Sequence, residues 1–313
     1  AFALGLLQSL QVKNYYVQSI VLCPTRELAD QVAKEIRKLA RTIHNIKVLT
    51  LCGGMPFGPQ IGSLEHGAHI IVGTPGRVEE HVRKGTLELD RVSTLVLDEA
   101  DRMLEMGFQE SLDNIIVDIP SQRQTLLFSA TFPDKIESIA KRIMQNPIRI
   151  EVESTHDNAS IKQHFYKVKD EEQRLTAVRL LLLKHQPESA VVFCATKREC
   201  QEVSDILSGE GFSAVSLHGD LEQRDRDQTL VRFANKSARV LVATDVAARG
   251  LDIENLDAVI NYQLARDTEV HVHRIGRTGR AGSKGLAFTL YTEKENYKLN
   301  QLAEYLGIQV INE

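Results

Sequence analysis

The 313-residue chain lacks the features that mark several classes of protein. It has no tryptophan and only 5% aromatic residues, so it offers few of the flat surfaces on which splayed bases stack. No run approaches the roughly 20 apolar residues that a membrane helix needs. No stretch shows the charged start, apolar core and cleavage site of a signal peptide. These absences predict a cytoplasmic protein that does not enter a membrane.

Cysteines and net charge narrow the possibilities further. The four cysteines, Cys23, Cys52, Cys194 and Cys200, fit neither a CxxC metal knuckle nor a disulfide framework, so we expect reduced thiols in the core. The net charge is −4, with acidic and basic residues interspersed. A nucleic-acid-binding surface, if present, must therefore be local.

Short β-branched runs alternate with segments of helical period along the whole chain. Residues 25–43 are one such helical segment, in which Leu28, Val32, Ile36 and Leu39 recur at helical spacing. Runs that are apolar on both faces indicate strands buried on both sides, as in parallel sheets covered by helices. The predicted strands lie within residues 17–24, 46–52, 68–75, 92–100, 123–130, 148–153, 189–196, 212–219, 238–245, 256–262 and 285–292.

One polar stretch interrupts this alternation. Residues 153–161 show no periodicity, and the strand and helix pattern resumes after them. We therefore predict two α/β domains, residues 1–153 and 161–313, joined by a linker at residues 154–160. Ligands of such sheets gather at the carboxyl ends of the strands, and polar residues follow most of the predicted strands.

The run at residues 92–100 ends on two adjacent carboxylates, Asp98 and Glu99, with Asp101 close behind. Nucleotide hydrolases use this arrangement to hold Mg²⁺ and to orient an attacking water. Asp98 would hold the magnesium through water, and Glu99 would be the general base. The alternative is that these acids cap the following helix, since acids favour helix N-termini.

Residues 271–282 supply a second constellation. Arg274, Arg277 and Arg280 recur at intervals of three with glycines between them, which would aim Arg277 and Arg280 at one phosphate. An arginine finger of this kind is worth about 10³- to 10⁵-fold in rate. The alternatives are a basic solvated loop or a histidine metal site, and the second lacks a third ligand of suitable spacing.

Seven short motifs occur along the chain in the order that defines one protein family. Through these motifs the chain resembles the DEAD-box RNA helicases of superfamily 2. They are PTRELA (24–29), GG (53–54), TPGR (74–77), DEAD (98–101), SAT (129–131), ATDVAARGLD (243–252) and HRIGRTGR (273–280). The resemblance spans nearly the whole chain. It implies two tandem RecA-like domains, ATP and Mg²⁺ as cofactors, and an RNA-stimulated ATPase.

The resemblance also implies roles for individual residues. Catalysis falls to Asp98, Glu99, Arg277 and Arg280, with Asp98 at the metal. Asp252 contacts the ribose of the nucleotide. Asp101, Ser129, Thr131 and His273 couple hydrolysis to strand separation. The implied RNA contacts are Arg26, Gly53, Gly54, Thr74, Arg77, Gly219, Gln223, Arg226 and Thr244.

Within the family, residues 51–58 and 217–234 resemble a bacterial member that acts on ribosomal RNA. This implies a role in ribosome biogenesis, with 23S rRNA or a precursor of the large ribosomal subunit as the partner. We expect the chain to be a monomer. Two alternatives from other classes are a non-catalytic RNA clamp and a DNA-directed motor of the same superfamily.

The chain departs from the family pattern at both ends. No GxxxxGK[ST] loop occurs in it, although that loop cradles phosphates and supplies a lysine to them. Residues 1–10 resemble the helix that follows this loop in the family. We therefore expect a chain that begins just past the lysine and hydrolyses ATP slowly or not at all. We also expect it to lack the small RNA-binding domain that follows in its nearest relatives.

Overall fold

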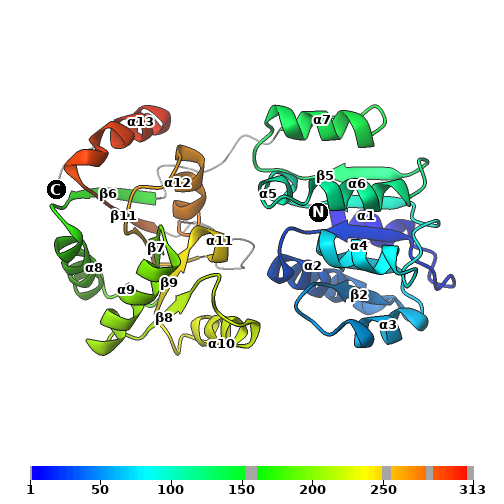
Figure 1. Ribbon diagram of the computed structural model, residues 1–313, viewed down its shortest axis with the longest axis horizontal. Coiled ribbons are helices and arrows are strands. Elements are labelled where there is room, and N and C mark those ends of the chain that lie inside the picture. Colours follow the sequence, from blue (N-terminus) through cyan, green and yellow to red (C-terminus); the bar gives the residue numbers. More distant parts are fainter. Residues whose placement is uncertain (1, 152–160, 249–254, 280–284, 309–313) are drawn as a thin grey trace. The chain divides into compact units, whose positions relative to one another are not determined.

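The computed structural model describes residues 2–151, 161–248, 255–279 and 285–308 (Figure 1). The chain forms two compact units, one of the described residues up to 151 and the other of those from 161 onward. The predicted linker at residues 154–160 lies outside the described residues. Among the described helices, none is long and apolar enough to cross a membrane.

The first unit is built on a five-stranded parallel sheet with the strand order β2-β3-β1-β4-β5. Its strands are β1 (Ser19–Leu22), β2 (Val48–Leu51), β3 (Ile70–Gly73), β4 (Thr94–Leu97) and β5 (Gln124–Leu127). Its helices are α1 (Phe2–Ser9), α2 (Arg26–Leu39), η1 (Ala40–Thr42), α3 (Phe57–Glu65), α4 (Pro75–Arg83), α5 (Ala100–Glu105), α6 (Gln109–Val117) and α7 (Asp134–Ile143).

Helices cover both faces of this sheet because successive strand residues point to opposite sides. Ile20 and Leu22 of β1 share one core with α4, α5, α6 and α7. Val21, between them, shares the other core with α1 and α2. The central strand is therefore buried on both faces, as its continuous apolar sequence predicts.

Helix α2 begins where its sequence supplies a cap. The Thr25 side chain accepts a hydrogen bond from the Leu28 backbone at 3.2 Å, which satisfies one of the first amides of the helix. The buried stripe consists of Ala29, Ala33 and Ile36, whereas Leu39 is 43% exposed. Ile36 of the predicted stripe is fully buried, and Leu28 and Val32 pack against the same core while partly exposed, so Leu39 is the one of the four that lies largely outside it.

The second unit holds a six-stranded parallel sheet with the order β6-β11-β10-β7-β9-β8. Its strands are β6 (Ile161–Lys167), β7 (Ala190–Cys194), β8 (Ala214–Leu217), β9 (Val240–Thr244), β10 (Ala258–Asn261) and β11 (Gly285–Tyr291). Its helices are α8 (Glu171–His185), α9 (Lys197–Gly209), α10 (Gln223–Ala234), α11 (Asp245–Ala248), α12 (Thr268–Ile275), η2 (Glu293–Glu295) and α13 (Asn296–Leu306). The predicted fold class, two α/β units with parallel sheets, is confirmed.

One predicted strand is wrong and one strand was missed. The described part of 148–153, residues 148–151, forms no strand, and Ile148 and Ile150 are 87% and 82% exposed. This run alternates isoleucine with charged residues, so it has no second apolar face to bury. Strand β6 was not predicted, and it pairs along its whole length with β11 at the end of the sheet. The four cysteines are buried and free, as expected.

Candidate functional site

The polar residues of the first unit gather where its strands end. Strand β4 stops at Leu97, and the Asp98 amide donates to the Leu22 carbonyl of β1 at 3.0 Å. The Asp98 carboxylate accepts a hydrogen bond from the Glu99 amide at 3.1 Å, and burial raises its pKa above the ordinary value. No lysine or arginine of the described chain counts among the groups that shift this pKa. Asp98 is therefore a half-buried carboxylate whose negative charge a bound cation would stabilise.

Glu99 occupies the cap position of α5 in a left-handed backbone conformation, with φ 51°. Its side chain makes no capping hydrogen bond to that helix. The capping alternative therefore fails for Glu99. A left-handed conformation costs about 1–2 kcal/mol for a residue with a side chain, and such strain is concentrated at functional sites.

The donors around Asp98 fit magnesium only in part. Mg²⁺ prefers oxygen ligands and takes one or two carboxylates together with water and phosphate oxygens. Within the described ranges, no group of three His, Cys, Asp or Glu side chains could hold a metal ion by itself. Asp98 could hold Mg²⁺ only if other ligands came from water and a nucleotide.

Asp101, Ser129 and Thr131 form one hydrogen-bonded network between α5 and the segment after β5. The Asp101 carboxylate accepts from the Thr131 amide at 3.1 Å and from its hydroxyl at 3.0 Å. The Ser129 hydroxyl accepts from the Asp101 amide at 3.3 Å and donates to the Thr131 carbonyl at 2.6 Å. Three of the four predicted coupling residues thus meet. The fourth, His273, lies on α12 of the second unit.

The predicted RNA contacts of the first unit also lie together, beyond the ends of β1, β2 and β3. The Gly53 amide lies 3.5 Å from the Thr74 hydroxyl, which is the long end of the hydrogen-bond range. Gly54 has φ 73°, and a Cβ there would come within 2.5 Å of Arg26 Nη1. Arg26 Nε is buried and has no hydrogen-bond partner within the described chain. The backbone conformation at position 54 therefore favours glycine, and any larger residue would also displace the end of the Arg26 side chain.

Arg77 is held by several partners rather than reaching into solvent. Its Nη1 donates to the Met55 carbonyl and to Gln60 Oε1, both at 2.9 Å, and its Nε pairs with Glu80 at 3.1 Å. The side chain is 11% exposed. Gln60 and His81, which complete this network, were not predicted. The spacing of four between Arg77 and His81 on one helix was the available signal.

Of the arginines at 274, 277 and 280 in the second unit, the structure describes the first two, and they lie in different places. Arg274 is 4% exposed and forms a two-bond pair with Asp245, at 2.6 and 2.8 Å. Its third nitrogen donates to Asn261 Oδ1 and the Gln263 carbonyl. Arg277 follows the end of α12, and its amide donates to the Arg274 carbonyl at 3.2 Å. Arg280 and Asp252 lie outside the described residues.

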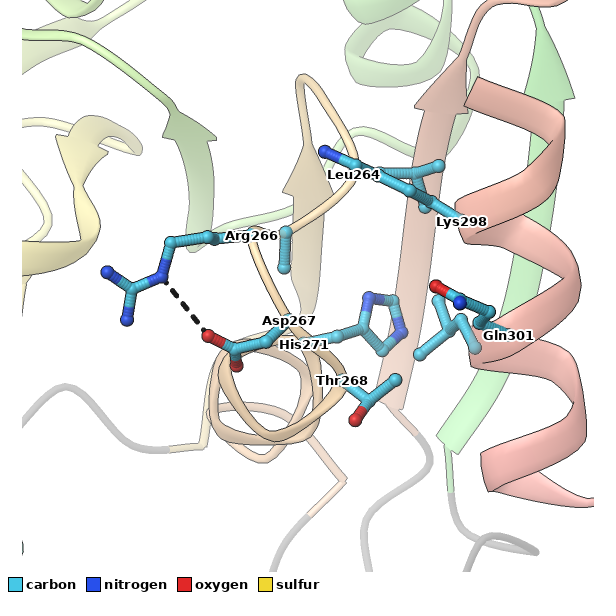
Figure 2. A pocket seen from close by; sticks show the side chains of 9 residues that line it. Leu264, Arg266, Asp267, Thr268, His271, Lys298 and Gln301 are labelled. Atoms are coloured by element: carbon cyan, nitrogen blue, oxygen red, sulfur yellow. Dashed lines mark hydrogen bonds and ion pairs between the residues drawn. The ribbon is translucent and has the colours of Figure 1, made fainter. Parts of the chain in front are cut away.

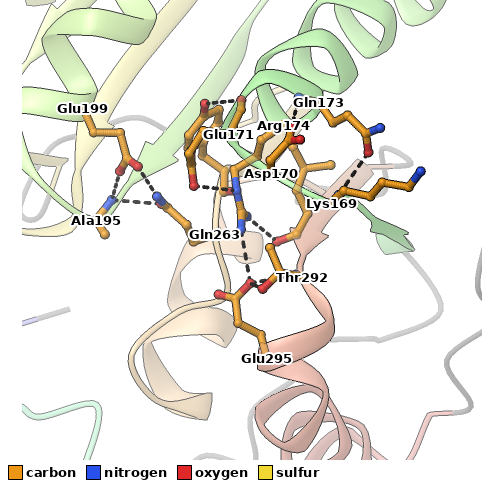
Figure 3. A network of polar contacts seen from close by, with 12 residues as sticks. Lys169, Asp170, Glu171, Gln173, Arg174, Ala195, Glu199, Gln263, Thr292 and Glu295 are labelled. Atoms are coloured by element: carbon orange, nitrogen blue, oxygen red, sulfur yellow. Dashed lines mark hydrogen bonds and ion pairs between the residues drawn. The ribbon is translucent and has the colours of Figure 1, made fainter.

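Figure 3 shows a second buried arginine, Arg174 of α8, at the same sheet edge. Its guanidinium donates to the carbonyls of Tyr262 and Leu290, the latter at 3.2 Å, and to Glu295. Gln263, which follows β10, bonds to Glu199 of α9. These contacts fix the strand ends from which α12 departs.

The other predicted RNA contacts of the second unit are distributed over two strand ends and one helix. Thr244 ends β9 and is 8% exposed, and Gly219 lies just past β8. Gln223 and Arg226 lie in the first turn of α10, where Gln223 donates to Asp227 at 2.8 Å. All four lie on the β8–β9 side of this sheet.

A small cavity of about 40 Å³ lies beside α12. Figure 2 shows the His271 ring of α12 facing Gln301 of α13 in this cavity. His271 contacts Gln163 at 3.2 Å, and burial lowers its pKa to about 3. A water occupies about 30 Å³ in the liquid, so this cavity has the size of a solvent site rather than of a nucleotide site.

Two family models match the chain. "DEAD/DEAH box helicase" matches residues 1–139, and "Helicase conserved C-terminal domain" matches residues 172–282. The chain is 57% identical over 310 residues to "ATP-dependent RNA helicase DbpA" of Escherichia coli, covering 99% of this chain and 68% of that protein. It is 43% identical to "DEAD-box ATP-dependent RNA helicase CshA" of Geobacillus kaustophilus, covering 96% of this chain and 64% of that protein.

A solved structure agrees with these matches. Saccharomyces cerevisiae Dbp5 bound to RNA and ADP BeF3 has a TM-score of 0.88 and 32% sequence identity. The match covers all of this chain and 81% of that one. The likeness confirms the predicted pair of RecA-like domains. Against the relatives compared by sequence, the chain spans about two thirds of their length.

Proposed function

Because the chain belongs to the DEAD-box family of ATP-dependent RNA helicases, we propose that it uses ATP hydrolysis to separate short stretches of paired RNA. One observation supports this most directly. The Asp98–Glu99 pair lies beside the Asp101–Ser129–Thr131 network at a single sheet edge. The proposed site for hydrolysis and the network proposed to pass on its state thus meet where α5 begins beside the segment after β5.

In this proposal Glu99 is the general base. Its carboxylate takes a proton from the water whose oxygen attacks the γ-phosphorus of ATP. The bond from that phosphorus to the bridging oxygen breaks, and ADP and phosphate leave. Mg²⁺, when bound with ATP at Asp98, supplies positive charge to the phosphate oxygens. Arg277 and Arg280 offset the charge that develops on the transferred group, and Asp252 holds the ribose.

The RNA contacts proposed for this chain are made to sugar and phosphate rather than to base edges. Small hydroxyls, arginines and the amides of glycine turns bind phosphates without reading sequence. Strand separation by a grip of this kind is largely indifferent to sequence. The proposed contacts are Arg26, Gly53, Gly54, Thr74, Arg77, Gly219, Gln223, Arg226 and Thr244.

Finer assignments follow from the resemblance of residues 51–58 and 217–234 to a bacterial member that acts on ribosomal RNA. We infer a cytoplasmic, monomeric protein whose RNA is 23S rRNA or a precursor of the large ribosomal subunit. Its domains are residues 1–153 and 161–313, joined by 154–160, and His273 completes the coupling network. Since these 313 residues contain no GxxxxGK[ST] loop, we expect them to turn over ATP slowly or not at all by themselves.

The proposal is tested by unwinding of a short RNA duplex. Two proteins are compared: the 313-residue chain, and an extended chain that joins it to an upstream segment carrying a GxxxxGK[ST] loop. We expect ATP-dependent unwinding from the extended chain and little from the shorter one. Because 2′-hydroxyls distinguish RNA from DNA, a DNA duplex of the same sequence should be a poor substrate. Equal activity on both duplexes would favour the DNA-directed motor instead.

A further inference from the structure

Gln60, on α3, is the centre of the network that holds Arg77. Its Oε1 accepts from Arg77 Nη1 and from His81 Nε2, each at 2.9 Å. Its Nε2 donates to the Cys52 carbonyl at 3.1 Å. The side chain is buried, with the residue 9% exposed. A single amide thus connects α3, α4 and the end of β2, and both lone pairs of its oxygen are used.

The same contacts bracket the glycine turn. Gln60 bonds to the carbonyl before Gly53 and Gly54, which is that of Cys52. Arg77 bonds to the carbonyl after them, which is that of Met55. The backbone of this turn is therefore fixed at both ends by side chains that also bond to each other. Gly54 lies within this turn at φ 73°, a conformation that glycine adopts readily.

His81 orients the glutamine. Since Gln60 Nε2 faces a carbonyl, its oxygen must face His81, and His81 Nε2 must carry the hydrogen. Burial lowers the pKa of His81 to about 4, so the ring is neutral and its Nδ1 accepts from the Thr86 hydroxyl at 2.9 Å. The ring also stacks on Phe57 at 4.1 Å. One tautomer and one ring position are thereby selected.

We propose that Gln60, oriented by His81, is a positioning residue that sets the Gly53–Gly54 turn and the Arg77 guanidinium for contact with an RNA phosphate. This inference rests on the proposed function and extends it to residues without a predicted role. Nη1 and Nε of Arg77 are engaged within the protein. Nη2 has no partner within the described part of the chain, so it is the nitrogen left for phosphate. Gln60 itself does not touch RNA.

The first test compares Gln60→Ala with Gln18→Ala in the 313-residue chain. Gln18 is a matched control, because it is 6% exposed and its amide also makes partly buried hydrogen bonds, to Gln11 and Asn14. It precedes β1 and so lies at the opposite edge of the same sheet. Binding of a fluorescein-labelled oligouridylate is measured over a range of salt, with thermal unfolding measured alongside.

We expect Gln60→Ala to weaken RNA binding about tenfold, the effect of one or two lost hydrogen bonds. Gln18→Ala should leave affinity within about twofold. In Gln60→Ala alone, the slope of log K against log salt should become shallower by about 0.7 for each phosphate that the protein no longer binds. A purely structural role would lower the unfolding temperature in both variants without changing the slope.

A second variant, His81→Phe, covers the case in which Gln60→Ala fails to fold. Phenylalanine keeps the ring on Phe57, and the Thr86 hydroxyl retains the backbone carbonyl of residue 81 as an acceptor, at 3.1 Å. The ring bonds to Gln60 and to the Thr86 hydroxyl are both removed, and only Gln60 is left with a lost partner that no other acceptor or donor replaces. We expect weaker RNA binding in the same direction as Gln60→Ala and smaller in size.

The outcomes separate this inference from the function on which it rests. If the unaltered chain does not bind oligouridylate, the RNA-binding proposal fails, and this inference fails with it. If the unaltered chain binds, but Gln60→Ala and His81→Phe behave like Gln18→Ala in affinity and salt slope, only the positioning role is overturned.

Discussion

At the carboxyl edge of the first sheet, burial raises the pKa of Asp98, and no arginine or lysine of the described chain offsets its charge. At the same edge of the second sheet, the buried Arg274 is paired through two nitrogens with Asp245 and bonded through the third to Asn261 and Gln263. Within the described residues, the first unit thus has a half-buried carboxylate whose pKa no lysine or arginine lowers, whereas the second unit pairs its buried arginine with a carboxylate.

We interpret the charge of Asp98 as one that a ligand offsets, and the charge of Arg274 as one that stabilises the fold. A half-buried carboxylate without a cationic partner destabilises a protein, and carboxylates with pKa values perturbed in this way cluster at sites that bind ligands. A buried pair that is fully hydrogen-bonded can be retained for architecture, because removing one partner strands the other. Sequence patterns alone treat both as motif residues.

Of the substitutions that test this comparison, Arg274→Ala should have the largest effect on folding stability. It leaves the partly buried Asp245 without its partner and removes a buried side chain, and we expect a loss of about 3–5 kcal/mol in the free energy of unfolding. Urea denaturation measures it. Arg198→Ala is the control, since the Arg198–Glu202 pair is on the surface, and it should have no measurable effect. Equal effects of the two substitutions would contradict the structural role of Arg274.

Asp98→Asn should move function and stability in opposite directions. In the extended chain, ATP turnover should fall at least about 100-fold, because the proposed magnesium ligand is removed. The free energy of unfolding at neutral pH should rise by about 0.5–1 kcal/mol, as a buried charge is removed. Turnover and urea denaturation are measured on the same preparation.

The pH dependence of the stability of Asp98→Asn tests whether the gain comes from removing a charge. The folded pKa of Asp98 is raised, so its destabilising effect is absent at low pH, where both states are protonated. It develops as the pH rises above about 4, the ordinary pKa of aspartate. The stability advantage of Asp98→Asn should therefore vanish in acid. A constant advantage at every pH would contradict the burial of a charge.

His271 is predicted to affect folding stability only in acid. Its folded pKa is about 3, below the ordinary 6.5, so the unfolded state binds more protons between these values. Folding stability should fall as the pH decreases from about 6.5, by about 1 kcal/mol or more between pH 7 and 5. Melting temperatures of the unaltered chain and His271→Gln measure this. The variant should lose less stability in acid, and a parallel loss would show that other groups dominate.

Much of the fold follows from apolar runs, and the failures have physical causes. The runs around β1, β3, β4, β7 and β9 are apolar on both faces because the strands are buried on both faces. Edge strand β6 has the sequence IKQHFYK, whose mixed pattern lacks that signal. Residues 148–151 carry alternating isoleucines but form no strand. Whether such a run forms a strand depends on its pairing with another strand, and the local sequence pattern does not show that pairing.

The sequence predicted residues of the candidate site only where they belong to a recognised motif. The meeting of Asp101, Ser129 and Thr131 follows from parallel strands that end at one edge. Gln60 could not be found, because its role comes from an amide that spans three elements distant in sequence. The regular spacing of Arg274 and Arg277 gave no sign that the first is buried in an ion pair.

The most direct test of the account is ATP hydrolysis by the extended chain with and without RNA, beside its Glu99→Gln variant. We expect RNA to stimulate turnover. Glu99→Gln should lower turnover about 10²- to 10⁴-fold, the range for removal of a general base, while RNA affinity stays within about twofold. Turnover that does not respond to RNA, or that survives in Glu99→Gln, would contradict the assignment of this sheet edge to RNA-coupled hydrolysis.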